Sequence, residues 1–184
     1  MRAAKQAIRA EVGAALKLVS PTERAQATGR AFAQLERTTT WRRARRVLIY
    51  APLPTEPDLD QWWTFGAERR GQREMCYPRI VGCELEVRLV RAPLQLRPTA
   101  FGLREPDPDR TEVVDPASLG LVIVPGVAFT RGGDRLGRGA GFYDLFLASL
   151  PPHVATAAFL FNCQVRDVLP VEPHDRRVQR LCIG

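Results

Sequence analysis

Helical spacing of apolar residues marks the first part of the chain. Between about Ala3 and Leu18, apolar side chains recur every three or four positions, which predicts a helix with one buried stripe. A second helix is predicted to start at Ser20-Pro21-Thr22-Glu23. Ser suits the N-cap, Pro the first helical position and Glu the third, where it closes a capping box. We expect this helix to run to about Glu36.

Short continuous apolar runs predict strands that are covered on both faces. Such runs occupy residues 47–50, 121–124 and 155–161, and we expect a last short strand near Leu181. Residues 85–89 alternate between apolar and polar side chains, which is typical of a half-exposed strand. Because these runs alternate with helical patterns, the sequence predicts an α/β fold, a three-layer α/β/α sandwich with a mostly parallel central sheet.

Length and composition are those of an ordinary globular protein. We expect one domain over residues 1–184, long enough to bury about 70% of the unfolded surface. No apolar run approaches the ~20 residues of a membrane span, and the N-terminus lacks the apolar core of a signal peptide. We therefore expect a cytoplasmic protein with no membrane partner. The four cysteines lack metal-site spacing and are expected to be buried, reduced thiols; they are Cys76, Cys83, Cys163 and Cys182.

The net charge of +7 favours anionic partners, which include nucleotides, polyanionic metabolites and nucleic acids. One local cluster of positive charge follows the second predicted helix. We interpret it as a solvated helix end in preference to an RNA-binding patch, because the sequence carries no signature of a nucleic-acid-binding domain. Nucleic acid is therefore not an expected partner. The cluster consists of Arg42, Arg43, Arg45 and Arg46.

Residues 124–144 combine a strand end, a Pro-Gly turn, a basic glycine-rich loop and a helix start near Phe142. This order is typical of phosphate binding, because glycines let the backbone approach a ligand and a helix N-terminus favours an anion. Arg135 and Arg138 add cations that suit phosphate oxygens. Asp144 lies where a carboxylate could hold Mg²⁺ beside bound phosphates. The glycine spacing alone fits a flexible hairpin tip equally well.

Other segments carry charges that could complete such a site. Lys5 and Arg9 are one helical turn apart and could clamp a phosphate, although their spacing alone favours an exposed basic face. Glu56 lies in a proline-rich loop after the 47–50 run, at the strand end where open α/β sheets bind ligands. By its position alone, Glu56 fits a solvated loop carboxylate better. A polar, turn-rich stretch at 101–109 predicts a loop.

As a set, these segments resemble the 5-formyltetrahydrofolate cyclo-ligase family, also called 5,10-methenyltetrahydrofolate synthetases. The likeness lies in residues 125–129 and 133–144, the Lys5-x-x-x-Arg9 pair, the Glu56 loop, residues 102–106 and Pro173-His174-Asp175. The resemblance implies ATP- and Mg²⁺-dependent cyclisation of 5-formyltetrahydrofolate to 5,10-methenyltetrahydrofolate, with release of ADP and phosphate. It also implies that the reaction passes through a phosphorylated formyl intermediate, an iminium phosphate.

The resemblance implies roles for individual residues. Arg138 and Tyr143 would be catalytic, with Tyr143 placed to touch the formyl group, and Asp144 and Asp175 would bind Mg²⁺. Contacts with ATP are implied for Lys5, Arg9, Arg135, Leu136, Gly137, Arg138, Gly139, Ala140, Gly141, Phe142 and Tyr143. Contacts with the reduced folate are implied for Ala51, Glu56, Phe101, Arg138, Gly139, Ala140, Gly141 and Phe142.

The expected partners are ATP and the reduced folate 5-formyltetrahydrofolate, which could carry a polyglutamate tail, and we expect a monomer or weak dimer. The alternative is a basic nucleotide- or RNA-binding module on the same scaffold that lacks ring closure. The complete set of charged residues favours the enzyme. Departures from the family pattern predict altered fine contacts with the substrate; they lie at Thr130, Ala140, Phe142, Leu145 and Gln179.

Overall fold

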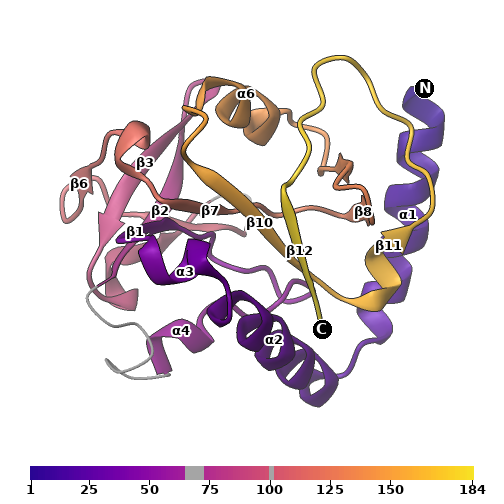
Figure 1. The fold of residues 1–184 in the computed structure, drawn as a ribbon, viewed down its shortest axis with the longest axis horizontal. Helices are drawn as coiled ribbons and strands as arrows, with labels where there is room; N and C mark the ends of the chain where they lie inside the picture. Colours follow the sequence, from indigo (N-terminus) through magenta and orange to yellow (C-terminus); the bar gives the residue numbers. More distant parts are fainter. Residues whose placement is uncertain (65–72, 100–101) are drawn as a thin grey trace.

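The computed structural model describes residues 1–64, 73–99 and 102–184, and it arranges helices around a central sheet (Figure 1). The α-helices are α1 (Arg2–Leu18), α2 (Pro21–Glu36), α3 (Thr39–Arg43), α4 (Gln61–Thr64) and α6 (Phe142–Ser149). The strands are β1 (Arg46–Leu48), β2 (Glu74–Val81), β3 (Glu84–Val90), β4 (Leu96–Pro98), β5 (Arg104–Pro106), β6 (Glu112–Val113), β7 (Leu121–Ile123), β8 (Ala128–Thr130), β9 (Arg135–Leu136), β10 (Ala155–Leu160), β11 (Val165–Arg166) and β12 (Arg180–Ile183). Short 3₁₀ helices are η1 (Pro93–Gln95), η2 (Pro116–Ser118) and η3 (Asn162–Gln164).

Seven strands form the central sheet in the order β12-β10-β7-β1-β2-β3-β6. The pairings that join β12, β10, β7, β1 and β2 are parallel, whereas β3 and β6 run antiparallel to their neighbours. In the middle of the sheet, Val47 of β1 pairs with Leu121 of β7 on one side and with Met75 of β2 on the other. The prediction of a mostly parallel sheet is confirmed.

Helices cover both faces of this sheet (Figure 1). On one face, α2 and α4 pack Phe32 and Trp62 into a core that includes Ile49. On the opposite face, α6 packs Phe146 into a second core that includes Leu48. Successive residues of a strand point to opposite faces, so the apolar run after Arg46 is buried on both sides. The predicted three-layer arrangement is confirmed.

Helix α1 lies to one side of these layers, beside β8 and β11 (Figure 1). Its buried residues Val12 and Leu16 belong to a third apolar cluster with Ala128 and Phe161. Strands β11, β8 and β9 form a small separate sheet at this end of the molecule. The packing holds α1 against the chain that leaves β7, and it thereby fixes the position of the side chains that α1 carries.

The helix starts follow the sequence closely. The hydroxyl of Ser20 accepts a hydrogen bond from the backbone N–H of Glu23, and the Glu23 carboxylate accepts one from the N–H of Ser20, at 3.2 and 2.9 Å. The predicted capping box is therefore confirmed. Helix α6 begins at Phe142 as predicted, directly after Gly141, whose φ of 79° lies in the left-handed region.

Three local predictions are wrong. The basic loop between the Pro-Gly turn and α6 contains the antiparallel pair β8–β9, and the loop expected at 101–109 contains β5, which pairs with β4. Strand β3 is buried, and not half-exposed, over Val87, Arg88 and Leu89. Arg88 is accommodated because it donates hydrogen bonds to Thr111 and to the carbonyl oxygen of Pro108. Arg88 also pairs with Glu86, two residues earlier in the same strand. A period-two pattern cannot reveal Thr111 and Pro108 as partners, since they follow in the chain more than 15 residues later.

All four cysteines are free thiols, as expected, but the expected burial holds only for Cys76 and Cys182. Burial raises the pKa of these two thiols to about 12 and about 11, which keeps them protonated at neutral pH. Cys83 is exposed at the turn between β2 and β3, so this part of the prediction is wrong. Among the described residues, the helices are too short or too polar to cross a membrane.

Candidate active site

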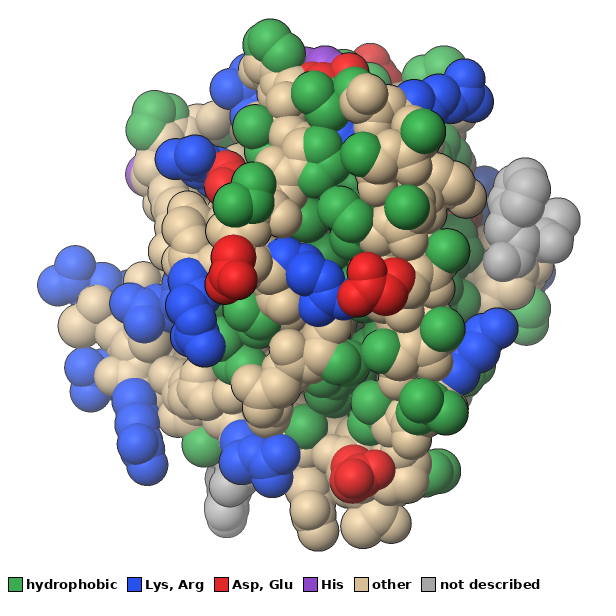
Figure 2. All heavy atoms as spheres, turned by 90° about the vertical axis from the view of Figure 1, so that its right-hand side faces the viewer, with side chains coloured by type: hydrophobic (Ala, Val, Ile, Leu, Met, Phe, Trp, Pro, Cys, Tyr) green, Lys and Arg blue, Asp and Glu red, His purple; other side chains and the backbone are tan. Residues whose placement is uncertain are grey.

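Four segments that are far apart in the sequence meet where the chain leaves β1 and β7. They are α1, the proline-rich loop at 51–58, the glycine-rich unit at 135–144 and the loop at 172–178. The site they form lies at the end of the molecule that α1 covers, where acidic and basic side chains lie next to one another (Figure 2). Carboxyl ends of parallel strands are the common location of ligand sites in α/β proteins.

Lys5 joins α1 to the loop at 172–178. Its ammonium donates hydrogen bonds to Oε2 of Glu172 and Oδ2 of Asp175, both at 2.7 Å, and the residue is only 7% exposed. Burial by itself would lower the pKa of Lys5, but the hydrogen bonds to the two carboxylates outweigh it and raise the pKa. Lys5 is therefore part of a buried ionic contact, and its position is incompatible with an exposed basic face.

Arg9 joins α1 to the glycine-rich unit. Its Nε donates a hydrogen bond to the carbonyl oxygen of Gly137 at 2.9 Å. Gly139 follows with a φ of 110°, and a Cβ atom at this position would lie 3.5 Å from the Arg9 guanidinium. The backbone of the loop thus lies against Arg9, and the positive φ of Gly139, which residues with a side chain rarely adopt, favours glycine at this position.

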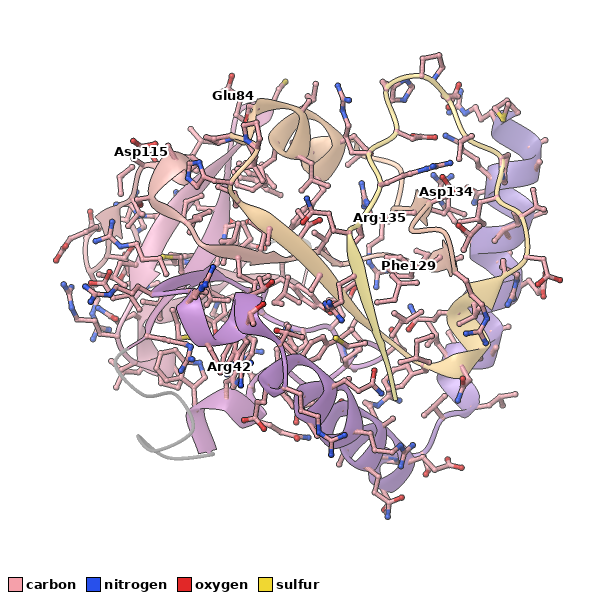
Figure 3. The ribbon with its side chains drawn as sticks, in the orientation of Figure 1. Arg42, Glu84, Asp115, Phe129, Asp134 and Arg135 are labelled. Carbon is pink, nitrogen blue, oxygen red and sulfur yellow. The ribbon has the colours of Figure 1, made fainter. Side chains whose placement is uncertain are left out.

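Arg135 is directed inward and contacts Asp144. Its Nη2 donates to Oδ1 of Asp144 at 2.6 Å, and its Nη1 donates to the carbonyl oxygen of Pro125 at 3.2 Å. The Arg135 side chain is 3% exposed. In Figure 3, Arg135 lies between α6 and α1, close to Phe129 and Asp134. A buried, charge-assisted contact of this kind fixes the orientation of the Asp144 carboxylate.

Arg138 reaches across to the loop after β1. Its Nε and Nη2 donate to Oε1 of Glu56 at 3.2 and 2.8 Å, while Oε2 of Glu56 accepts from the backbone N–H of Leu53 at 3.0 Å. The two side chains differ in exposure, with 52% for Arg138 and 8% for Glu56. Glu56 is therefore a buried carboxylate with both oxygens engaged, and not a solvated loop residue.

Two buried phenols accompany this ion pair. The hydroxyl of Tyr143 is buried and has no hydrogen-bond partner among the described residues. Burial raises the pKa of Tyr143 far above its ordinary value, and the negative charge of Glu56 adds to this effect. Burial and Glu56 also raise the pKa of Tyr50, which lies just beyond the end of β1. Both hydroxyls consequently remain protonated at neutral pH and can act as donors.

The two predicted metal ligands lie on the same side of the molecule. The backbone N–H of Arg176, which directly follows Asp175, donates to Oδ1 of Asp144 at 3.2 Å. Burial would raise the pKa of Asp175, but the hydrogen bonds from Lys5 and from the N–H of Glu172 lower it, so the group is an anion. Within the described chain, Oδ2 of Asp144 receives no hydrogen bond and is available to a ligand. Carboxylate oxygens on adjoining segments fit Mg²⁺, which prefers few protein ligands together with phosphate oxygens.

A further acidic residue, Glu172, belongs to this group and had not been predicted. Ligand atoms of Glu172, His174 and Asp175 lie within 4.8 Å of one another, and the ammonium of Lys5 bridges Glu172 and Asp175. The sequence signal that could have revealed Glu172 is its spacing from Asp175, since the Glu172 N–H donates to the Asp175 carboxylate three residues later at 2.7 Å.

The remaining predicted residues lie in or beside the same loop. Gly137 is half-buried, Gly139, Ala140 and Gly141 are exposed, and Phe142 opens α6. Leu136 and Ala51 are buried with the apolar clusters, so only their backbone atoms could reach a ligand. The carbonyl oxygen of Leu136 already accepts a hydrogen bond from Val127 at 2.7 Å. Phe101 lies outside the described residues.

Two of the departures from the family pattern, Thr130 and Gln179, have structural partners of their own. The Thr130 hydroxyl donates to Asp134 at 2.9 Å, and Gln179 exchanges hydrogen bonds with Thr156 at 3.0 Å. Leu145 is an exposed side chain on α6. Thr130 and Gln179 thus stabilise the turn at β8–β9 and the start of β12. These two departures therefore affect the backbone segments that hold the site more directly than they affect the charged groups of the site.

The basic cluster after α2 is separate from this site. Arg42 and Arg43 form the exposed last turn of α3, as expected for a solvated helix end. Arg46 pairs instead with Glu74 of the neighbouring strand β2. Figure 3 places Arg42 well away from Arg135 and Asp134. The positive charge that serves the candidate active site therefore comes from α1 and the glycine-rich unit.

Known proteins are similar to this chain in both sequence and fold. The model of the 5-formyltetrahydrofolate cyclo-ligase family matches residues 1–184. The 5-formyltetrahydrofolate cyclo-ligase of Mycolicibacterium smegmatis is 33% identical over 136 residues, covering 71% of this chain and 69% of that protein. The protein of the same name from Mus musculus is 25% identical over 193 residues, covering 98% of this chain and 94% of the relative.

Solved structures agree with these matches. The structure of 5,10-methenyltetrahydrofolate synthetase from Aquifex aeolicus superimposes with a TM-score of 0.83 and 28% identity, covering 97% of this chain and 89% of that one. A 5,10-methenyltetrahydrofolate synthetase from Mycoplasma pneumoniae has the same fold, with a TM-score of 0.75, 19% identity and 97% coverage of both chains. Because the family model extends over the whole sequence, the chain belongs to the 5-formyltetrahydrofolate cyclo-ligase family.

Proposed function

We propose that this protein is a 5-formyltetrahydrofolate cyclo-ligase. It uses ATP to convert 5-formyltetrahydrofolate into 5,10-methenyltetrahydrofolate and releases ADP and phosphate. The observation that supports this proposal best is the convergence of charged groups from four distant segments. Lys5 and Arg9 meet the glycine-rich unit, Arg138 meets Glu56, and Asp144 meets the loop that carries Asp175.

The chemical difficulty of the reaction is that the oxygen of a formamide is a poor leaving group. Transfer of the γ-phosphoryl group from ATP to the formyl oxygen breaks the bond to ADP and gives an N5-iminium phosphate. N10 then adds to the activated carbon, and loss of the N10 proton and of phosphate leaves the methenyl bridge. Such a reaction depends on positioning and on neutralisation of charge more than on covalent catalysis by the protein.

The residues of this chain can supply those contributions. Lys5, Arg9 and Arg138 are the cations that would receive the phosphates of ATP. The protonated hydroxyl of Tyr143 would donate to the formyl oxygen and hold it toward the γ-phosphorus. Glu56 would bind N–H donors of the reduced folate, because a buried carboxylate selects for groups that can donate hydrogen bonds.

Magnesium is part of the proposal. Asp144 and Asp175 would hold Mg²⁺, and Glu172 lies close enough to Asp175 to contribute. The bound ion would neutralise part of the phosphate charge. Arg135 orients Asp144 through its buried guanidinium, and Lys5 orients Asp175.

We further propose that the chain acts as one cyclo-ligase-like domain over residues 1–184 in the cytoplasm, as a monomer or weak dimer. The RNA-binding alternative is less well supported, since the exposed Arg42 and Arg43 lie away from the candidate site.

A turnover assay tests the proposed function. Purified protein with Mg²⁺, ATP and 5-formyltetrahydrofolate should produce the absorbance of the methenyl product, with one ADP formed for each product molecule. Omission of ATP or addition of a chelator should abolish the signal. An absence of product at high enzyme concentration, with ligand binding and folding verified, would contradict the proposal.

A further inference from the structure

The cations of the candidate site are held by acceptors of the protein itself. Lys5 contacts Glu172 and Asp175, and Arg135 contacts Asp144, and both cationic side chains are less than 10% exposed. Arg138 differs because its side chain is 52% exposed while its acceptor, Glu56, is 8% exposed. Arg138 can therefore leave its partner by rotating in solvent, without disturbance of the packed interior.

Glu56 cannot lose Arg138 without a replacement. Its Oε2 is satisfied by the backbone N–H of Leu53, whereas Oε1 is satisfied by Arg138 alone among the described residues. A buried carboxylate that loses its only cationic partner is strongly destabilised. Departure of Arg138 is consequently favourable only when another group donates hydrogen bonds to Oε1.

Arg138 belongs to the loop that would carry the phosphates. It lies between Gly137, whose carbonyl oxygen is held by Arg9, and Gly139, which lies against the Arg9 guanidinium. While Arg138 is paired with Glu56, its charge is neutralised and its Nε and Nη2 donors are directed at Oε1 of Glu56. A nucleotide that is to receive the charge and these two donors of Arg138 must compete with Glu56.

We propose that the Glu56–Arg138 ion pair couples the two substrates of the enzyme. The N–H donors of the amino-pyrimidinone edge of the folate replace Arg138 on Oε1 of Glu56, and the released guanidinium binds the phosphates of ATP. This inference rests on the proposed function. Since coupling between binding sites is reciprocal, folate strengthens nucleotide binding by the same factor as nucleotide strengthens folate binding.

The first test uses nucleotide alone. Calorimetric titration with a non-hydrolysable ATP analogue and Mg²⁺, without folate, should show about five- to tenfold tighter binding for Glu56→Gln than for the wild type, within the usual range of coupling between sites. The matched control is Glu112→Gln, which removes the same charge from an exposed pair with Arg91 on β6, at the opposite end of the molecule (Figure 1). The control should bind the analogue as the wild type does.

A second variant identifies the residue that transmits the effect. In an Arg138→Ala background, Glu56→Gln should no longer change the affinity for the analogue, because the guanidinium that it releases is absent. Equal tightening in both backgrounds would mean that Glu56 acts only through its general charge, and it would overturn the inference. Equal affinities of Glu56→Gln, Glu112→Gln and the wild type would overturn it as well.

The wild type provides a test that does not depend on the folding of Glu56→Gln. Saturating 5-formyltetrahydrofolate should tighten binding of the analogue to the wild type and leave binding to Arg138→Ala unchanged. A wild-type protein that turns over its substrates without such tightening retains the proposed function and overturns the coupling alone. A protein that binds neither ligand contradicts both.

Discussion

The carboxylate of Asp144 lies 2.6 Å from the guanidinium of Arg135, a side chain that is almost completely buried. The same oxygen of Asp144 accepts the backbone N–H of Arg176. One carboxylate thus connects the start of α6, strand β9 and the loop that carries Asp175. This contact links the stability of the region to the position of the proposed metal ligand.

We expect Asp144→Asn to lose most of its Mg²⁺-dependent activity while the fold survives. The amide carries no charge for Mg²⁺, and the buried Arg135 loses its anionic partner, which should lower the free energy of unfolding by about 1–3 kcal/mol. Titration of turnover with Mg²⁺, together with urea unfolding, measures both effects. The control Asp167→Asn alters an exposed carboxylate and should change neither quantity. Wild-type turnover in Asp144→Asn would remove Asp144 from the proposed metal site.

Lys5→Ala should weaken the apparent affinity for ATP about tenfold, which corresponds to ~1.4 kcal/mol. The variant loses a buried ammonium and also the contact that orients Asp175. The matched control is Lys17→Ala, because Lys17 is the other lysine of the chain and is exposed in the last turn of α1. An unchanged affinity in Lys5→Ala would restrict Lys5 to a role in stability.

The same ionic contact predicts a dependence of stability on pH. The pKa of Asp175 is lowered in the folded state, so its contribution is present above the unfolded value of ~3.9 and is lost as the pH falls through the folded value. The pKa of Lys5 is raised, so its contribution is present below ~10.4 and is lost as the pH rises through the folded value. The stability difference between wild type and Lys5→Ala in urea should therefore be largest near neutral pH and shrink in strong acid and strong base. A difference that is independent of pH would contradict this account.

Tyr143→Phe and Tyr77→Phe should have opposite effects on stability and on activity. The hydroxyl of Tyr143 is buried and finds no hydrogen-bond partner in the part of the chain that the structure describes, so its removal should leave the free energy of unfolding unchanged or raised. The hydroxyl of Tyr77 accepts a hydrogen bond from Trp63 at 2.7 Å, and its removal should cost about 1 kcal/mol. Turnover should fall in Tyr143→Phe, with a higher KM for the folate, and persist in Tyr77→Phe. Full activity of Tyr143→Phe would exclude its hydroxyl from the reaction.

Gly133→Ala should destabilise the protein because of where the glycine lies. Its φ is 91°, and a Cβ atom would lie 2.3 Å from the carbonyl oxygen of Val178, at the end of the loop that carries Asp175. The positive φ alone should cost about 1–3 kcal/mol. The control Gly13→Ala, in α1 with open space around it, should stabilise the protein by about 1 kcal/mol. Thermal unfolding should show a lower melting temperature for Gly133→Ala and a higher one for Gly13→Ala than for the wild type. Similar melting temperatures of the two variants would contradict the prediction.

Local signals made much of the fold predictable. The capping box at Ser20 depends on residues three apart, and the burial of β1 on both faces follows from its uninterrupted apolar run. The same holds for the start of α6 after Gly141. These features are set by backbone sterics and by hydrogen bonds within one turn, so neighbouring residues are sufficient to define them.

The failures have a common physical reason. The burial of Arg88 depends on hydrogen-bond acceptors in Thr111 and Pro108. Strands β8 and β5 form because β9 and β4 are available to pair with them across a turn. Cross-strand pairing and the solvation of a charge are decided by groups that come into contact during folding. A pattern of alternating polarity within one strand gives no information about those groups.

The sequence by itself indicated the family, the two N-terminal helices, the start of α6 and the apolar strands of the central sheet, and through the resemblance it named most of the charged residues that gather at the glycine-rich unit. Only the tertiary structure decided how those charges pair. Lys5 meets Asp175 across 170 positions and Arg138 meets Glu56 across 82, and each pairing depends on the packing of α1 and of the loop after β1. Burial then sets the strength of each pair, because a charge withdrawn from water must be satisfied by the protein. That difference in burial leaves half of the Arg138 side chain in contact with solvent, whereas Arg135 and Lys5 are enclosed by the protein.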